Sequence, residues 1–280
     1  VPAHLPDIPD VRREISEYYG SVRRCDDTMG AVLEVLDRAG VSNSTLVLFL
    51  SDNGMAFPFA KTNCYLNSTR TPLLARWPGV IEPGGVDGEH FVSGIDLMPT
   101  VLDAAGIACP PEVDGTSCVP VLRGEREAER DTVFTQFHQT AGRRNYPMRC
   151  VQNRRYGYIY NPWSDGSRVF RNESQSGRTF PAMRRAVESD PGIAERVDLF
   201  LYRVPEELYD FEHDPAALVN LVDDPAYETV LHEMRNALER YMVATDDPAL
   251  HAFRTRDDAE AIEQLYAEME RSIGDCGDYS

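Results

Sequence analysis

The residues whose types and spacing are best suited to chemistry are Asp52, Asn53 and Lys61. Asp52 and Asn53 come just after the apolar run TLVLFL at residues 45–50, where a strand is expected to end. A carboxylate and an amide oxygen are the hard ligands that Ca²⁺ or Mg²⁺ prefers, and Gly54 lets the backbone turn close to a bound ion. The competing interpretation is a polar turn, because Asp-Asn-Gly is common turn chemistry.

Lys61 is the only lysine in the sequence, which carries 28 basic residues in all. Its compact ammonium group is a suitable point charge for a tetrahedral oxyanion such as sulfate. An ordinary surface lysine is the competing interpretation. That interpretation is weakened because every other basic residue is an arginine, so we favour the oxyanion-binding role.

Hydrophobic spacing predicts alternating helices and strands over roughly the first 135 residues. Residues 10–39 have apolar positions at helical spacing, and Gly40 can end that helix. The continuous run at 45–50 is typical of a strand buried on both faces of a parallel sheet. A second strand is expected at 73–77 and a helix at 95–105. This alternation predicts an α/β fold, with a layered sheet and helices on both faces.

The pattern changes after residue 140 and predicts a smaller α+β subdomain. Two strands joined by a turn, one further strand and two amphipathic helices are expected at 148–161, 208–211, 227–242 and 259–273, respectively. We therefore divide the chain into residues 1–140 and residues 141–280.

Composition excludes several classes of function. The net charge of −18, from 46 acidic and 28 basic residues, is unsuited to nucleic acid or anionic membranes, whose binding depends on neutralising phosphates. An acidic, lysine-poor composition predicts a halophilic protein, and a GC-rich genome that favours arginine codons is the alternative. No apolar run approaches the roughly eighteen residues of a membrane span. The six cysteines form no CxxC pair, which argues against a zinc ribbon.

Several longer motifs, in their order along the chain, resemble the sulfatases of the alkaline phosphatase superfamily. They cover nearly the whole chain: LPDIPDVR, EYYGSVRRCDDTMG, LFLSDNG, RTPLLARWPG, VSGIDLMPTVLDAAG, DGTSCVPVLRG and ELYDFEHDPAALVNL. Within that family the chain is most similar to the N-sulfoglucosamine sulfohydrolases (sulfamidases), on residues such as Phe57-Pro58, Thr62-Asn63 and Tyr146-Pro147-Met148-Arg149. Those enzymes carry arginine at the position of Lys61.

The resemblance implies roles for the residues already singled out. Asp52 and Asn53 would bind Ca²⁺, with Mg²⁺ as the second possibility, and Asp52 would help to activate the nucleophile. Lys61 would hold a sulfate oxygen of a sulfated small molecule or saccharide. His138 falls where the related enzymes have substrate-facing polar residues, and an ordinary loop histidine is its alternative. Arg149 either lines the sugar pocket or pairs with a carboxylate. The other five histidines show no metal-ligand spacing, and most are expected at the surface.

The mechanism that the resemblance implies uses formylglycine, made from Cys or Ser in a C/S-x-P-x-R motif. No such motif occurs in the sequence, and Cys118 to Arg123 reads C-x-P-x-x-R, which is one residue too long. We therefore expect the nucleophile in a segment before Val1, in a complete protein that hydrolyses sulfuric esters or sulfamates. One alternative is a phosphatase or phosphodiesterase of the same superfamily, whose two-zinc site needs a histidine where Asn53 stands. The other is a non-catalytic, sulfatase-like binding module.

Overall fold

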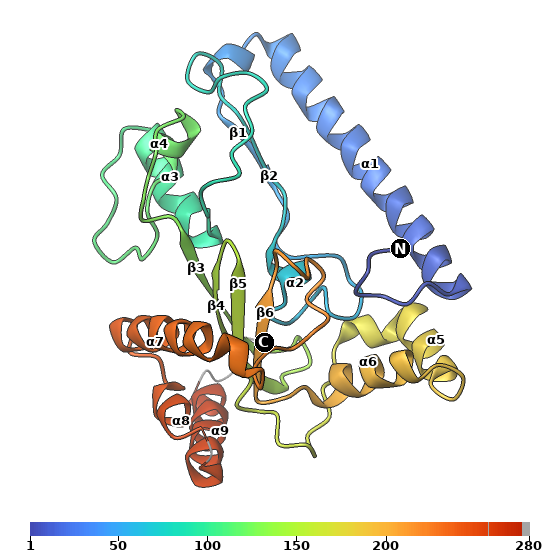
Figure 1. Ribbon diagram of the computed structural model, residues 1–280. Coiled ribbons are helices and arrows are strands. Elements are labelled where there is room, and N and C mark those ends of the chain that lie inside the picture. Colours follow the sequence, from blue (N-terminus) through green and yellow to red (C-terminus); the bar gives the residue numbers. More distant parts are fainter. Residues whose placement is uncertain (257, 276–280) are drawn as a thin grey trace. The chain divides into compact units, whose positions relative to one another are not determined.

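The computed structural model describes residues 1–256 and 258–275 as helices packed on two antiparallel sheets (Figure 1). The chain separates into two compact units. The four-stranded unit comprises Val1–Glu14, Asn53–Arg70 and Phe134–Ser280, and the two-stranded unit comprises Ile15–Asp52 and Thr71–Val133. Among the described residues, no helix has both the length and the apolar character that crossing a membrane would require.

The two-stranded unit contains most of the long helix α1 and the strands that follow it. Its elements are α1 (Pro9–Ala39), η1 (Ser42–Ser44), β1 (Val47–Leu50), β2 (Leu73–Arg76), η2 (Gly94–Asp96), α3 (Leu97–Ala104) and α4 (Val119–Leu122). The predicted helix at 10–39 is confirmed. Gly40 ends it with φ +70° and a hydrogen bond from its N–H to the Asp37 carbonyl, a conformation that glycine adopts without steric cost.

The parallel, doubly buried strand predicted at 45–50 is wrong. Strand β1 pairs antiparallel with β2, with Leu50 opposite Leu73. Its residues are half-buried or exposed in the described chain, and Leu50 is 39% exposed. A run of apolar residues reports that a segment is extended and apolar, but it does not encode the direction of its neighbour.

The four-stranded unit is built on a sheet in the order β3-β4-β5-β6. Its strands are β3 (Thr132–Gln139), β4 (Asn145–Asn153), β5 (Tyr156–Tyr160) and β6 (Glu206–Asp210). The predicted strand pair at 148–161 is confirmed, with Arg149 opposite Tyr160, and so is the pairing of the third predicted strand. The helical elements of this unit are α2 (Leu66–Thr69), η3 (Glu173–Ser176), α5 (Thr179–Ala186), α6 (Pro191–Tyr202), η4 (Pro225–Tyr227), α7 (Glu228–Ala244), α8 (Leu250–Arg254) and α9 (Ala259–Asp275).

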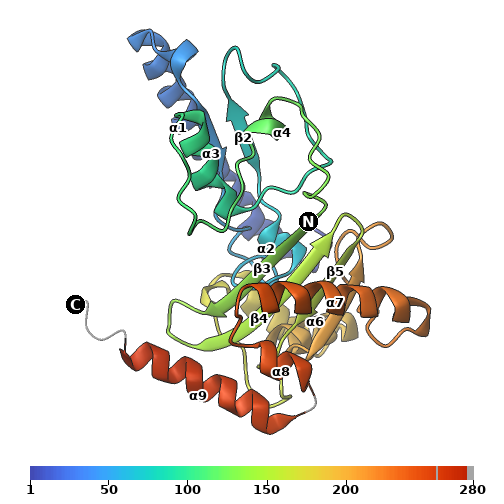
Figure 2. The same ribbon diagram turned by 90° about the vertical axis from the view of Figure 1, so that its left-hand side faces the viewer.

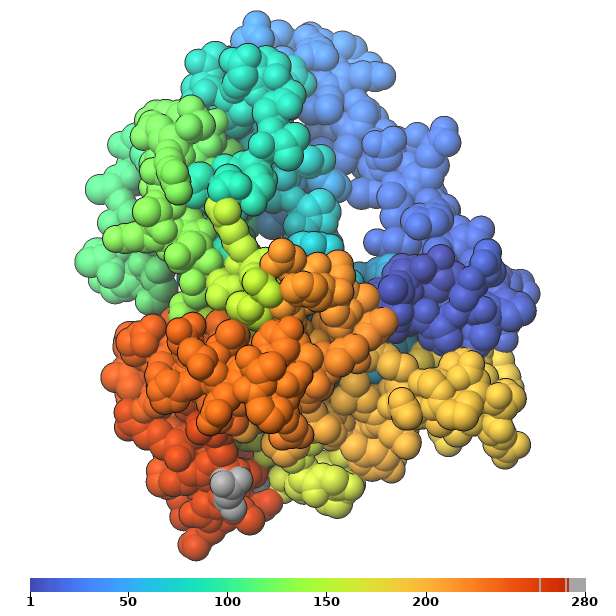
Figure 3. All heavy atoms as spheres, viewed as in Figure 1, coloured from blue at the N-terminus to red at the C-terminus, as the bar shows by residue number. Residues whose placement is uncertain are grey.

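Both faces of this sheet are buried, so alternate residues of its strands enter two different cores. On one face, Met148 and Tyr209 pack with Phe200 of α6 and with residues of the segment 53–70. On the other face, Tyr158 packs with Leu238 and other residues of α7 (Figure 2). The outer side of α7 remains at the surface (Figure 3). Burial of each large apolar side chain stabilises the fold by roughly 1.5–3 kcal/mol.

The observed units differ from the predicted division at residue 140. The later unit does begin close to that point, at Phe134, but it also includes Val1–Glu14 and Asn53–Arg70. These two early segments pack on the first core through residues such as Ile8, Phe59 and Tyr65. A linear reading of composition does not detect a segment that leaves one unit and joins another.

Three of the five other histidines, His213, His232 and His251, are exposed, as expected for most of them, whereas His4 is buried, with 4% of its surface exposed. Burial, with a smaller contribution from Arg196, lowers the pKa of His4 from 6.5 to about 4. Below pH 6.5 the unfolded chain therefore binds a proton that the folded chain does not. We expect the free energy of unfolding to fall by about 3 kcal/mol between pH 6.5 and pH 4 from this group alone.

Urea titrations of wild type and His4→Gln across that pH range measure this contribution. The variant is expected to lose less stability on acidification than the wild type. Equal pH dependence in the two proteins would contradict the assignment.

Candidate active site

The segment 53–70 carries most of the residues that the sequence singled out. Asp52 is exposed and ends the segment Ile15–Asp52 of the two-stranded unit. Asn53, the next residue, begins the segment Asn53–Arg70 of the four-stranded unit. The Gly54 N–H donates to the Ser68 carbonyl at 2.9 Å. A Cβ atom at Gly54 would lie 2.0 Å from the Asn67 carbonyl oxygen and 2.4 Å from the Ala60 carbonyl oxygen. The segment therefore folds back on itself, and only glycine fits at its start.

Gly54→Ala is expected to destabilise the protein by about 1–3 kcal/mol, because both clashing atoms belong to the backbone and cannot rotate away. Gly30→Ala is the matched control, since a Cβ there meets nothing within 4 Å in the interior of α1, where alanine is the better helix former. Thermal or urea unfolding compares the two variants. Equal stability of both would show that the segment can open at Gly54 without cost.

Lys61 lies in a tight turn of this segment. Its neighbours Phe59 and Thr62 adopt φ 65° and 58°, a left-handed conformation that is uncommon outside glycine. Asn63 holds the turn from within: its amide nitrogen donates to the Lys61 carbonyl at 2.7 Å, and its amide oxygen accepts the Tyr65 N–H at 3.0 Å. Strained backbone of this kind persists where the surrounding structure over-determines it.

The segment that contains Asn172 and Glu173 holds the same turn from outside. The Asn172 amide donates to the Lys61 carbonyl at 3.4 Å and to the Thr62 hydroxyl. The Lys61 ammonium lies 3.1 Å from a carboxylate oxygen of Glu173, and 31% of the lysine side chain remains exposed. This ion pair could not be predicted from the sequence, because its two partners are far apart along the chain.

Tyr65 anchors the far end of the turn to the sheet. Its hydroxyl donates to both carboxylate oxygens of Glu207 at 2.8–2.9 Å. Glu207 is fully buried on β6 and also accepts hydrogen bonds from Tyr209 and from the Asn161 amide. Burial and the adjacent Glu207 charge raise the pKa of Tyr65, so its hydroxyl stays protonated and able to donate. The lysine turn is therefore fixed to a rigid element of the four-stranded unit.

His138 and Arg149 lie on neighbouring strands, β3 and β4. His138 is exposed, whereas 2% of the Arg149 side chain is exposed. The Arg149 guanidinium forms a two-point ion pair with Asp247 at 2.5 and 2.8 Å, which is the carboxylate-pairing alternative named above. Partial burial lowers the pKa of His138, and the Arg149 charge lowers it further. Substrate binding by Arg149 stays a prediction, without a contact in the structure that supports it.

One carboxylate and histidine group outside this region has ligand atoms close enough to share a metal. Among the described residues it consists of Asp210, Glu212 and His213. Arg155 already pairs with Asp210 at 2.8 Å, and its hydrogen bonds hold the pKa of Asp210 well below the ordinary range. A guanidinium at this position competes with a cation, so we assign no metal here.

Comparison with known proteins finds a family that part of the chain matches. Residues 4–107 match the family model described as Sulfatase. Over this segment the chain is similar to the sulfatases. It is 34% identical to the human N-sulphoglucosamine sulphohydrolase over 259 residues, which are 89% of this chain and 51% of that protein. The chain thus spans about half the length of the curated relatives it matches.

Solved structures support the α/β fold of the sulfatases. A putative sulfatase from Bacteroides thetaiotaomicron aligns with a TM-score of 0.65 at 23% identity, over 93% of this chain and 49% of that chain. A protein solved in complex with its substrate, D-glucosamine-2-N,6-O-disulfate, aligns with a TM-score of 0.60 at 19% identity, over 81% of this chain and 40% of that chain. Identities of this size indicate the fold, and the sulfatase fold class predicted from sequence is confirmed.

Proposed function

We propose that the protein containing this chain hydrolyses sulfuric esters or sulfamates of sugars. The observation that carries the proposal is the 34% identity to N-sulphoglucosamine sulphohydrolase across 89% of the chain. The construction of the Lys61 turn supports it. Asn63 and Asn172 hold the backbone carbonyl of Lys61, the Tyr65–Glu207 hydrogen bonds anchor the turn, and Glu173 pairs with the ammonium.

We propose Ca²⁺ as the metal, with Asp52 and Asn53 among its ligands and Mg²⁺ as the alternative. Both side chains offer oxygen atoms, and the closely folded backbone at Gly54 fits a segment that wraps a bound ion. When bound, such an ion draws negative charge from a sulfate oxygen. Formylglycine is expected in the complete protein from the family resemblance, and the 280 residues contain no C/S-x-P-x-R motif.

The roles of the chain's own residues follow from their contacts. Lys61 binds a sulfate oxygen, and in the free protein Glu173 keeps its ammonium in place at 3.1 Å. The substrate must displace this carboxylate, so binding exchanges one ion pair for another. His138 is exposed and its lowered pKa favours the neutral ring, which suits hydrogen bonding to sugar hydroxyls near neutral pH. The Arg149–Asp247 ion pair ties β4 to the segment after α7. It thereby holds β4 beside β3, the strand that carries His138.

Direct measurements distinguish the proposed sulfatase function from two alternatives. A phosphatase or phosphodiesterase with two zinc ions would need imidazole where Asn53 offers an oxygen. A non-catalytic binding module would bind sulfated sugar without turning it over. We would express the product of the complete reading frame, quantify its metals, and assay N-sulphoglucosamine, a sugar sulfate ester and a phosphate monoester.

Calcium or magnesium together with sulfate release is the expected result. Stoichiometric zinc with phosphate release would replace the proposal with the phosphatase alternative. Binding without turnover would establish the non-catalytic module.

A further inference from the structure

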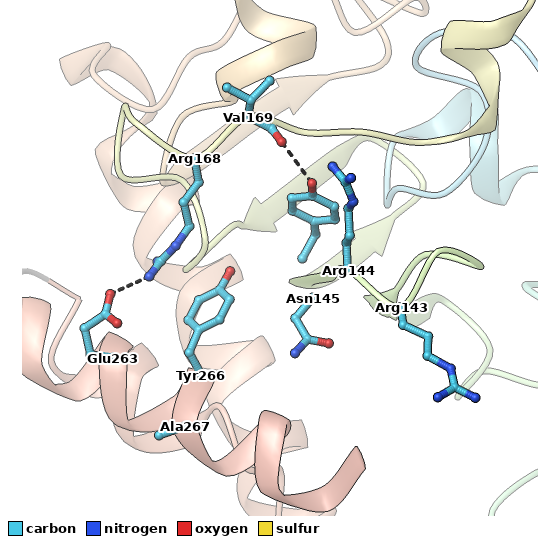
Figure 4. Close-up of a pocket in the computed structure, with 9 residues that line it drawn as sticks. Arg143, Arg144, Asn145, Arg168, Val169, Glu263, Tyr266 and Ala267 are labelled. Atoms are coloured by element: carbon cyan, nitrogen blue, oxygen red, sulfur yellow. Dashed lines mark hydrogen bonds and ion pairs between the residues drawn. The ribbon is translucent and has the colours of Figure 1, made fainter. Parts of the chain in front are cut away.

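The four-stranded unit contains a cavity of about 630 Å³ that the proposed sulfatase chemistry does not use. It lies where the turn between β3 and β4, the segment around residue 168 and helix α9 meet (Figure 4). The lining residues are Arg143, Arg144, Asn145, Tyr146, Arg168, Val169, Glu263, Tyr266 and Ala267. None of the residues of the Lys61 turn belongs to this lining.

The charge of this lining opposes that of the chain. Three arginines and one glutamate give the cavity wall a formal charge of +2, in a protein whose net charge is −18. Within the described residues, neither the Arg143 nor the Arg144 guanidinium pairs with a carboxylate, although acidic residues outnumber basic ones in the chain. Arg168 already pairs with Glu263, so the local attraction for anions comes from Arg143 and Arg144.

In the cavity wall, Arg168 and Tyr266 are held by direct contacts. The Arg168 guanidinium stacks on the Tyr266 ring, 4.1 Å from its centre, and pairs with Glu263. Arg168 Nη1 lies 3.5 Å from Asp165 but makes no hydrogen bond, and the buried Tyr266 hydroxyl makes none either. Two buried polar atoms without hydrogen-bond partners beside one cavity call for an explanation.

Arg144 and Asn145 also line the cavity. Figure 4 shows Arg144 and Arg168 on opposite sides of Tyr266 in this view, while the Arg143 side chain runs away from them. The Asn145 amide oxygen is used by Gln139 at 2.9 Å, which leaves its amide nitrogen as a further donor. Arg143 itself has φ 56° in the turn that presents both arginines.

We propose that this cavity is a second binding site, which takes a sulfate group of a sulfated saccharide. The inference rests on the proposed function for the choice of saccharide, and on the cavity alone for the choice of an oxyanion. Guanidinium groups match the oxygens of sulfate in a two-point geometry. The asparagine amide suits the sugar to which the sulfate is attached, and the volume accommodates more than a lone ion.

The test measures binding of D-glucosamine-2-N,6-O-disulfate, unsulfated glucosamine and inorganic sulfate by calorimetry at one ionic strength. It uses the product of the complete reading frame in a Lys61→Ala background, so that the proposed oxyanion contact of the active site does not contribute. We expect the disulfated sugar to bind, Arg144→Ala to weaken that binding about tenfold, and Tyr266→Phe to weaken it several-fold without loss of stability. Arg184→Ala, which removes the same charge from exposed α5, is the matched control and should bind as before.

Each of the other outcomes overturns the proposal in a distinguishable way. Equal binding of inorganic sulfate and the sugar would overturn the saccharide assignment. Binding that is unaffected by Arg144→Ala and Tyr266→Phe would place the ligand elsewhere. Binding that requires Lys61 would assign all of it to the proposed active site, which would leave the proposed function intact and remove the second site.

Discussion

Lys61→Ala, made in the product of the complete reading frame, is expected to lower the turnover of a sugar sulfate about a hundredfold or more. The ammonium is the one cation held in the tight turn of the segment 53–70, and its proposed task is to stabilise charge that develops on a sulfate oxygen. Because that charge is greater in the transition state than in the bound substrate, the loss should fall mainly on kcat. Steady-state kinetics with N-sulphoglucosamine measures it.

Two further variants separate catalysis from mere positive charge. Lys61→Arg keeps the charge and the reach, so we expect its turnover within about tenfold of wild type. Glu173→Gln removes the carboxylate 3.1 Å from the ammonium and is expected to lower KM, because the substrate no longer competes with an internal ion pair. Unchanged turnover in Lys61→Ala would remove this residue from the site.

The local structure of the chain could be predicted from its sequence because local patterns determine it. The periodicity of residues 10–39 and the glycine after them fixed helix α1. Alternation and turn residues at 148–161 predicted β4 and β5. In both cases the information lies within one segment, and the period of the apolar residues distinguishes helix from strand.

The direction of β1 and the burial of His4 could not be predicted in this way. Each depends on a partner far along the chain: β1 on β2, and His4 on the core beside Arg196. A polar residue type predicts a surface position on average, and the average fails where the fold encloses the ring.

In the candidate site, too, the sequence identified residues by their type but did not identify the residues that contact them. Asp52, Asn53 and Lys61 were found because their types are unusual at their positions in the sequence. The residues that hold the site together, Glu173 and Glu207, were not found, because a glutamate in an acidic chain carries no distinguishing signal. Sequence therefore indicated which groups could react, and the fold was needed to show which groups restrain them.

Arg149 and Asp247 form the most deeply buried ion pair among the described residues, with 2% and 3% of their side chains exposed. Asp247→Ala is expected to destabilise the protein by about 3–5 kcal/mol, because it leaves a guanidinium in the interior without its counter-charge. It also removes the carboxylate that accepts the Ala249 N–H at 2.8 Å. Urea unfolding measures the loss, and Asp223→Ala, at an exposed position, is the matched control.

The double variant Arg149→Met with Asp247→Leu decides what the pair contributes. Replacement of a buried ion pair by apolar side chains of similar volume is often close to neutral, so most of the lost stability should return. If Arg149 only positions its neighbours, the double variant in the complete protein should retain KM for a sugar sulfate. The pKa of His138 should change little, because the variant removes both the Arg149 charge that lowers it and the Asp247 charge that raises it. A rise in KM with restored stability would instead show that Arg149 contacts the substrate.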